Sequence, residues 1–195
     1  MGSTRKAGRP KVPAADRILR AASEMFYREG IRAVGVDAIA AKADVTKKSL
    51  YDNFGSKDAL IAAYLRARDE RWRTWLLDTV DRQGGTAKER LLSTFDALAE
   101  WMKHENPRGC GFVNAAAELP HDGHPARAVV MDQKQWLRGY LAELAAEGGA
   151  ADPESLAEQL MILHEGANVA NSLDISANAA QRAREIASFL VTDLR

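Results

Sequence analysis

The sequence has little of what secreted and membrane-spanning proteins require. Its 195 residues include a single cysteine, Cys110, so no intramolecular disulfide can form and a reducing compartment is expected. No apolar run approaches the roughly 20 residues that cross a bilayer. The basic N-terminus is not followed by an apolar stretch, so no secretory signal peptide is expected. These absences predict a cytoplasmic protein with no membrane partner.

Strand-like segments, with apolar residues at every second position, are also missing. Apolar residues instead recur at helical spacing in about nine segments, which loops rich in Gly, Pro, Asn and Asp separate. The sequence therefore predicts an all-α fold. The expected helices cover approximately residues 13–29, 37–43, 46–53, 57–80, 87–106, 109–119, 125–147, 153–173 and 179–194.

Charge is distributed unevenly along the chain, although the formal net charge is zero. Residues 1–60 contain 12 Lys/Arg and 7 Asp/Glu, which gives a net charge of +5. Residues 61–195 contain 15 and 20, which gives −5. This asymmetry indicates a short basic module for a polyanion, joined to an acidic body with another task.

Residues 36–51 have the pattern of a helix-turn-helix, in which two short helices are joined by a tight turn. Ile39, Val45 and Leu50 lie where they can form a small core between the two helices. Thr46 is a good N-cap for the second helix, and its hydroxyl and the neighbouring amides suit a phosphate oxygen. The pattern therefore predicts a small DNA-reading module in the basic part of the chain.

The first turn of the second helix carries Lys47, Lys48 and Ser49. In a helix-turn-helix this helix enters the major groove, where lysine donates to guanine O6 and N7 or pairs with phosphate. The alternative interpretation is a helical subdomain whose lysines are merely solvated.

Residues 50–60, directly after this turn, read LYDNFGSKDAL. At this spacing from the first helix, residues 14–62 resemble the DNA-binding domain of the tetracycline-repressor (TetR) family, whose signature is leucine-tyrosine-x-x-phenylalanine-x-serine-lysine-x-x-leucine. The resemblance implies that Thr46, Tyr51 and Lys57 hold phosphates and that Phe54 anchors the helix. The predicted DNA-binding residues are Arg9, Thr46, Lys47, Lys48, Ser49, Tyr51, Asn53 and Lys57.

Four positions depart from the family pattern, and the role of the N-terminal arm stays open. Gly35 stands where a capping threonine is frequent, and Lys48 stands where glycine or alanine is common. Asp52 and Asn53 replace aromatic or basic residues that are frequent there, and Asp52 could repel phosphate or pair with a neighbouring lysine. The arm around Arg9 could enter the minor groove or be a disordered solubilising tail.

The resemblance implies three parts: a flexible basic arm (1–12), a three-helix helix-turn-helix domain (13–56) and a larger helical ligand-binding and dimerisation domain (57–195). In the family, the last two long helices form a four-helix bundle across a twofold axis. Small and apolar residues at helical spacing suit such packing here, although they also suit the core of one protomer. The predicted dimer interface contains Ala167, Ala170, Asn171, Ala183, Ile186, Ala187 and Leu190.

All four tryptophans lie in the C-terminal body. Aromatic side chains with a polar edge commonly line pockets for small organic molecules, and they are equally ordinary core residues. The predicted effector pocket contains Trp72, Trp101, Cys110, Phe112, Asn114, Trp136, Tyr140 and His164.

Cys110 lies in a stretch, residues 108–114, that resembles a segment of some TetR regulators, including members that sense oxidants or electrophiles. A nearby Arg108 or a helix N-terminus would favour a reactive thiolate, whereas burial would leave an inert structural cysteine. His121 and His124, near Glu118 and Asp122, have only loose metal-ligand spacing. We expect neither a metal site nor a cofactor.

The sequence lacks a hydrolase elbow, a phosphate-binding glycine loop and a dinucleotide fingerprint, so no enzyme is expected. The expected function is a ligand-responsive transcriptional repressor. It would bind a palindromic double-stranded operator as a homodimer and leave it when a small-molecule effector binds. Two alternatives remain: a repressor that senses oxidants through Cys110, and a DNA-binding protein with no effector.

Overall fold

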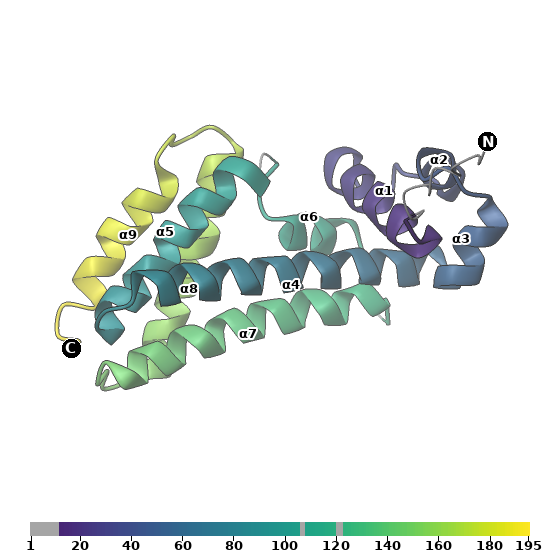
Figure 1. Cartoon of the computed structure of the whole chain (residues 1–195). Helices are drawn as coiled ribbons and strands as arrows, with labels where there is room; N and C mark the ends of the chain where they lie inside the picture. Colours follow the sequence, from purple (N-terminus) through teal and green to yellow (C-terminus); the bar gives the residue numbers. More distant parts are fainter. Residues whose placement is uncertain (1–11, 106–107, 120–122) are drawn as a thin grey trace, which may run out of the picture. The chain divides into compact units, whose positions relative to one another are not determined.

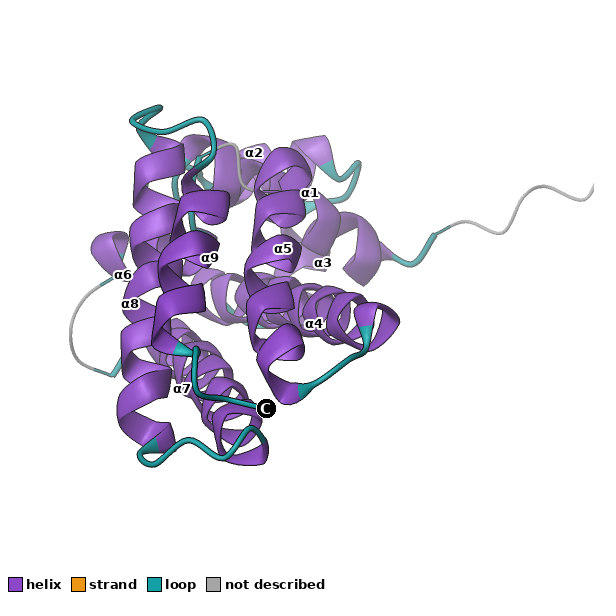
Figure 2. Cartoon of the chain, turned by 90° about the vertical axis from the view of Figure 1, so that its left-hand side faces the viewer, coloured by secondary structure: helices purple, strands orange, loops and turns teal. Residues whose placement is uncertain are grey.

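A computed structural model describes residues 12–105, 108–119 and 123–195. Within these ranges the chain forms nine α-helices and no strand, which confirms the all-α prediction (Figures 1 and 2). The helices are α1 (Ala14–Glu29), α2 (Val36–Lys42), α3 (Lys47–Phe54), α4 (Lys57–Gln83), α5 (Ala87–Glu105), α6 (Gly111–Glu118), α7 (Pro125–Glu147), α8 (Pro153–Ser172) and α9 (Ala179–Leu190).

The predicted helix ends lie close to these bounds, with the largest difference at the C-terminus. The sequence predicts a last helix that extends to Leu194, whereas α9 ends at Leu190. After Leu190 the chain leaves the helix, because the backbone of the last residue hydrogen-bonds to other helices and loops. The Arg195 amide donates to the Gly148 carbonyl, and the Arg195 carbonyl accepts from the Lys88 amide.

The chain divides into two compact units, unit 1 (Met1–Tyr64) and unit 2 (Leu65–Arg195). The division falls inside α4, whereas the sequence analysis puts the boundary before this helix, at residue 56. The first two turns of α4 belong to unit 1 because their apolar side chains complete its core. Leu60 and Ile61 are buried there, and the ring of Tyr64 lies 5.8 Å from that of Phe26.

Unit 1 is built around one apolar face of α1. Ile18, Ala22 and Phe26 recur at helical spacing on this face, and all three are buried. Gly30 ends the helix with φ 93°, a left-handed conformation that glycine adopts without a steric penalty. This stop allows the chain to reverse toward α2.

Unit 2 contains α5 to α9 and most of α4. The views agree that α5 lies beside α9 and that α9 lies beside α8 (Figure 2). Alanines at the close contacts, including Ala183 and Ala187 on α9, allow the helices to approach one another around Phe95. Among the described residues, no helix is long and apolar enough to cross a membrane.

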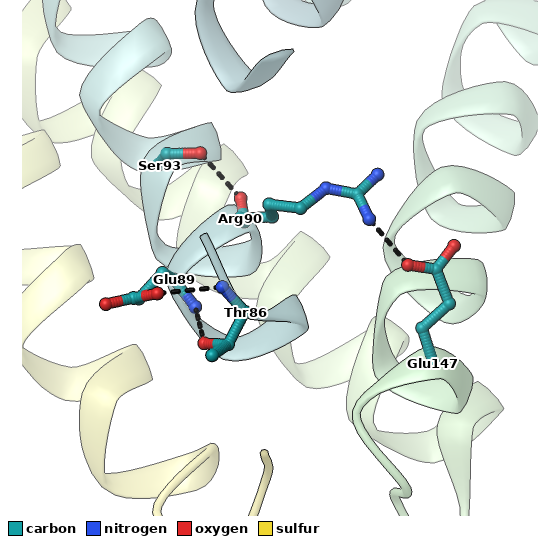
Figure 3. Close-up of polar contacts among 5 residues, drawn as sticks. All are labelled: Thr86, Glu89, Arg90, Ser93 and Glu147. Atoms are coloured by element: carbon teal, nitrogen blue, oxygen red, sulfur yellow. Dashed lines mark hydrogen bonds and ion pairs between the residues drawn. The ribbon is translucent and has the colours of Figure 1, made fainter. Parts of the chain in front are cut away.

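The start of α5 is fixed by a capping box, shown in Figure 3. The Glu89 amide donates to the Thr86 hydroxyl (3.3 Å), and the Glu89 carboxylate accepts from the Thr86 amide (2.7 Å). These hydrogen bonds, chiefly the one to the Thr86 backbone, lower the pKa of Glu89. One residue further on, Arg90 reaches Glu147 at 2.6 Å and so links the start of α5 to the end of α7 (Figure 3).

Candidate DNA-binding helices and effector cavity

The turn between α2 and α3 is held by contacts from inside unit 1. Ile39 and Leu50 are fully buried between the two helices. One guanidinium nitrogen of Arg17, on α1, donates to the carbonyls of both Ala43 and Asp44 at 2.8 Å. Arg17 carries no signal in the sequence, because its bonds span 26 and 27 residues and no local motif marks them.

The N-terminus of α3 has the cap that the sequence predicts. Thr46 is the N-cap, and its hydroxyl accepts a hydrogen bond from the Ser49 amide at 3.1 Å. A hydroxyl also has one hydrogen to donate, which is what a phosphate oxygen needs. By contrast, Gly35 caps α2 without any side-chain hydrogen bond, as expected from the missing threonine.

Both lysines in the first turn of α3 are exposed and paired with carboxylates. The ammonium of Lys47 lies 3.0 Å from Asp37, and that of Lys48 lies 2.8 Å from Asp52. Of the two roles considered for Asp52, pairing with a lysine is therefore the one found. The hydrogen bond and charge of Asp37 raise the pKa of Lys47, so its ammonium stays charged. DNA phosphates would have to compete with these acids.

The remaining predicted DNA-binding residues follow on α3 and at the start of α4. Tyr51 is exposed, and Asn53 donates its amide to the Ser49 carbonyl at 2.7 Å. The ammonium of Lys57 lies 6.0 Å from the centre of the Phe26 ring. Arg9 lies outside the described residues. The helix-turn-helix thus presents Thr46, Lys47, Lys48, Tyr51 and Asn53 to solvent.

Unit 2 encloses a small cavity between α4, α5, α6, α7 and α8, with a volume of about 30 Å³. This is room for about two water molecules. Five of the eight residues predicted for the effector pocket line it: Trp72, Trp101, Cys110, Phe112 and His164. The rings of Trp72 and Trp101 meet edge to face, with 5.3 Å between their centres.

The other three predicted pocket residues do not line this cavity. Asn114 donates its amide to the Arg108 carbonyl at 2.8 Å. Trp136 and Tyr140 stack on each other, with ring centres 5.8 Å apart. The Trp136 ring also lies 4.6 Å from the guanidinium of Arg73. Composition identifies aromatic residues, but it does not say which side of a helix faces a cavity.

Several polar wall residues are absent from the sequence prediction, above all Gln133, Lys134 and Glu165. The Lys134 ammonium lies 2.6 Å from the Glu165 carboxylate and 3.5 Å from the Cys110 sulfur. Burial acts to lower the pKa of Lys134, but Cys110 and Glu165 outweigh it, so the pKa is raised. One signal was available: Gln133 interrupts the apolar stripe of α7 that continues through Leu137.

His164, on α8, is a buried residue of the cavity wall. Its Nε2 lies 3.2 Å from the Thr94 hydroxyl, and its ring centre lies 4.3 Å from that of Phe95. Burial, followed by the positive charge of Lys134, lowers the pKa of His164 to about 3. The imidazole is therefore neutral at physiological pH.

Cys110 occupies the N-cap position of α6, which places it at a helix N-terminus as the sequence analysis considers. The cation within reach of its sulfur is Lys134. Gly109, the preceding residue, has φ 75°, and a Cβ there would come within 2.7 Å of the Ser172 side chain on α8. This close approach requires glycine and holds the start of α6 against α8.

The residues predicted for the dimer interface lie on different sides of α8 and α9. Ala167, Ala183 and Ala187 are buried in the protomer's own core, Ala170 and Asn171 are half-buried, and Ile186 and Leu190 are exposed. Ala183 and Ala187 do recur at helical spacing, but all three buried alanines lie on the faces of α8 and α9 that point into the protomer. The exposed apolar face of these helices and the loop between them, here called the α8–α9 face, contains Ile162, Val169, Leu173, Ile175, Ile186, Phe189 and Leu190.

The histidines considered as metal ligands show no such arrangement in the described part of the chain. No group of three or more His, Cys, Asp or Glu side chains is placed there to hold a metal ion. His124 instead caps α7, where its Nδ1 accepts from the Ala126 amide at 3.2 Å. His121 and Asp122 lie outside the described residues.

A helix-turn-helix joined to a larger helical unit is the architecture of a transcription regulator. The family model described as bacterial regulatory proteins of the tetR family matches residues 18–64, and a tetracyclin repressor-like C-terminal domain matches residues 87–187. The chain therefore belongs to the TetR family of transcription regulators, whose members are not enzymes.

Individual relatives agree with this assignment. The chain is 32% identical over 181 residues to the transcriptional regulator AcuR of Cereibacter sphaeroides, covering 88% of this chain and 82% of AcuR. It is 26% identical over 165 residues to the transcriptional repressor NemR of Escherichia coli, covering 79% and 81%. A TetR-family regulator from Streptomyces coelicolor superposes with a TM-score of 0.85 at 31% identity, covering 93% and 95% of the two chains.

Proposed function

We propose that the protein is a ligand-responsive transcriptional repressor that acts on DNA in the cytoplasm. One observation carries this proposal: one unit of the chain presents a helix-turn-helix with two lysines at the exposed start of α3, and the other unit contains a cavity lined by aromatic and polar side chains. The first feature suits a duplex and the second suits a small molecule. Similarity to a relative named as a repressor supports repression as the direction of control.

The proposed DNA-binding form is a homodimer on a palindromic operator. The α8–α9 face supports this, because the side chains of Leu173, Ile175 and Phe189 are between 65% and 79% exposed. Large exposed apolar side chains of this kind favour a partner, and a second copy offers the same surface across a twofold axis. Two copies would read two half-sites about one helical turn apart, roughly 34–36 Å.

The proposed route of release runs through α4. This helix begins with residues of the DNA-binding unit, and its later turns supply Arg68 and Trp72 to the cavity wall. A ligand in the cavity would shift α4 and thereby the two reading helices. The shift requires the ligand to bind the DNA-free conformation more tightly than the DNA-bound one.

The DNA-binding part of the proposal is tested by reversing the charge of Lys48. Operators are first selected from a randomised duplex pool, and affinity is then measured by fluorescence anisotropy. Lys48→Glu should lower operator affinity by roughly 100-fold, because a base or phosphate contact is replaced by repulsion. Lys103→Glu, an equal charge change on the exposed surface of unit 2, should have little effect. Both variants should elute as the same oligomer as the wild type.

Retained affinity in Lys48→Glu would show that α3 is not the reading helix. A compound screen for release of the selected operator tests the effector. If no compound releases the wild type, the alternative of an effector-independent DNA-binding protein would be favoured.

A second candidate function is supported by the 3.5 Å contact between the Lys134 ammonium and the Cys110 sulfur. A cation stabilises a thiolate, which peroxide oxidises to a sulfenic acid while the peroxide itself is reduced to water. If oxidation controls DNA binding, hydrogen peroxide should release the wild type but not Cys110→Ser. Equal responses of the two proteins would discard thiol sensing.

A further inference from the structure

Three residues that line the cavity in unit 2 each have a buried polar atom that lacks a hydrogen-bond partner among the described residues. These atoms are the Trp72 indole nitrogen Nε1, the Gln133 amide oxygen Oε1 and the Glu165 carboxylate oxygen Oε2. Trp72 and Gln133 are almost fully buried, at 5% and 3% exposure. Buried polar atoms in proteins are nearly always paired, so three among the wall residues of one cavity favour a polar ligand there.

These atoms define the hydrogen bonds that an occupant must make. The indole nitrogen only donates, whereas the two oxygens accept. The complement is a molecule with one acceptor and two donors. A primary carboxamide, with one carbonyl oxygen and two N–H groups, has this set on three adjacent atoms.

The charges on the wall favour an uncharged occupant. The Lys134 ammonium is already engaged by the other oxygen of Glu165 at 2.6 Å, and Arg68 donates to the Glu105 carbonyl at 2.8 Å. An entering carboxylate would bring no donor to Glu165 and would place a second negative charge beside it. An ammonium would face Lys134 and Arg68. The apolar rest of the wall includes Trp101 and Phe112, which suit a short alkyl group or a flat ring.

We infer that the effector of this regulator is a small uncharged carbonyl compound bearing N–H donors, of which a primary carboxamide is the simplest. The inference rests on the proposed role of unit 2 in effector binding. In the inferred complex, the carbonyl oxygen of the ligand accepts a hydrogen bond from the Trp72 indole, and its N–H groups donate to Gln133 and Glu165. The volume of about 30 Å³ has room for about two water molecules and is smaller than any such ligand, so binding requires the cavity wall to open.

Two sets of nearly isosteric probes test this chemistry. Propionamide, propionate and butanone differ only in the terminal group, as do benzamide, benzoate and acetophenone. Each probe is titrated to about 50 mM against the full-length protein, with sodium chloride added to equalise ionic strength, because DNA binding depends on salt. The readouts are the thermal unfolding midpoint and the release of the selected operator.

The expected result is that at least one amide raises the unfolding midpoint and releases operator, with an affinity about tenfold or more above those of its carboxylate and ketone. Trp72→Phe and Gln133→Met each remove one unpartnered atom, so each should weaken amide binding by about tenfold. Gln133→Met should leave the unfolding midpoint without ligand nearly unchanged, since no internal hydrogen bond is lost. Trp72→Phe also removes buried ring atoms that pack on Trp101, so it should lower this midpoint and is judged by amide affinity alone. Gln135→Met, on the exposed side of the same helix, is the matched control.

Three results would overturn the inference: a carboxylate or ketone that acts as well as its amide, no response to either amide, or unchanged amide affinity in both cavity variants. The compound screen separates these failures from failure of the proposed function. Release of the wild type by some other class of compound would leave the repressor intact and reject the carboxamide. DNA binding that no compound affects would reject effector control itself.

Discussion

At the scale of single residues, His164 shows how the cavity of unit 2 differs from an ordinary protein surface. An exposed imidazole titrates near pH 6.5, whereas burial and the nearby Lys134 lower the pKa of His164 to about 3. The unfolded chain therefore binds a proton on this residue at a pH where the folded chain does not. Folding stability is linked to that difference in proton binding.

The linkage predicts that acid destabilises the wild type through His164. Its contribution is fully present above the unfolded pKa of about 6.5 and is lost progressively as the pH falls toward the folded value. Between pH 7 and pH 5 the free energy of unfolding should fall by about 2 kcal/mol more in the wild type than in His164→Gln. Urea unfolding at both pH values measures this.

His104→Gln makes the same substitution at an exposed position of α5 and is the matched control for this measurement. If the wild type and His164→Gln lost stability equally on acidification, His164 would not be buried as a neutral imidazole.

At the scale of elements, α3 carries a carboxylate that competes with DNA phosphates for one of its own lysines. The Lys48–Asp52 pair lies one helical turn apart on an exposed face, and such pairs contribute little to stability. Their effect on binding is larger, because a carboxylate close to the DNA offsets one cation in the contact with phosphates. We therefore expect Asp52 to limit DNA affinity rather than to support the fold.

Removing this carboxylate should strengthen DNA binding. Asp52→Asn is expected to raise affinity for non-operator duplex by about 3- to 10-fold at low salt and to steepen the salt dependence. Thermal stability should hardly change. Anisotropy titrations at several salt concentrations measure both quantities. Asp16→Asn, which removes an exposed charge from α1, controls for net charge.

If Asp16→Asn increased affinity as much as Asp52→Asn, long-range charge rather than the Lys48 pair would explain the effect. Weaker binding by Asp52→Asn would instead indicate that Asp52 itself contacts the bases.

The helices also show what the sequence can and cannot predict. Helix starts depend on local chemistry, so the starts expected at residues 46 and 153 lie within one residue of the observed starts of α3 and α8. The faces of those helices depend on which neighbour covers them. Ala183 and Ala187 have the spacing of an interface, yet α5 and α8 of the same chain cover them.

The cavity shows the same limit more strongly. Its wall combines residues from five helices, and the sequence marks only those with unusual side chains, such as Trp72 and Cys110. Lys134 and Glu165 look like ordinary surface charges until the fold brings them within 2.6 Å of each other. Long-range pairing of this kind leaves no local signature in one sequence.

At the scale of the whole molecule, the α8–α9 face is the largest feature that one chain leaves unexplained. Of the described residues, Phe189 is the most exposed large apolar side chain, at 79%. In the proposed symmetric dimer each substitution acts twice, because each copy contributes the same surface. A single substitution on the α8–α9 face should therefore dissociate the proposed dimer without unfolding the protomer.

Phe189→Glu should convert the dimer to monomers without unfolding them. Losing two buried phenylalanine contacts weakens association by at least about 4 kcal/mol, or roughly 1000-fold in the dissociation constant. Sedimentation equilibrium measures the change, and circular dichroism should show that each helical protomer remains folded. Operator affinity should fall in parallel, because a single helix-turn-helix reads only one half-site. Met131→Glu, a similar change at an exposed position on α7, should stay dimeric, and its dissociation would argue for a different interface.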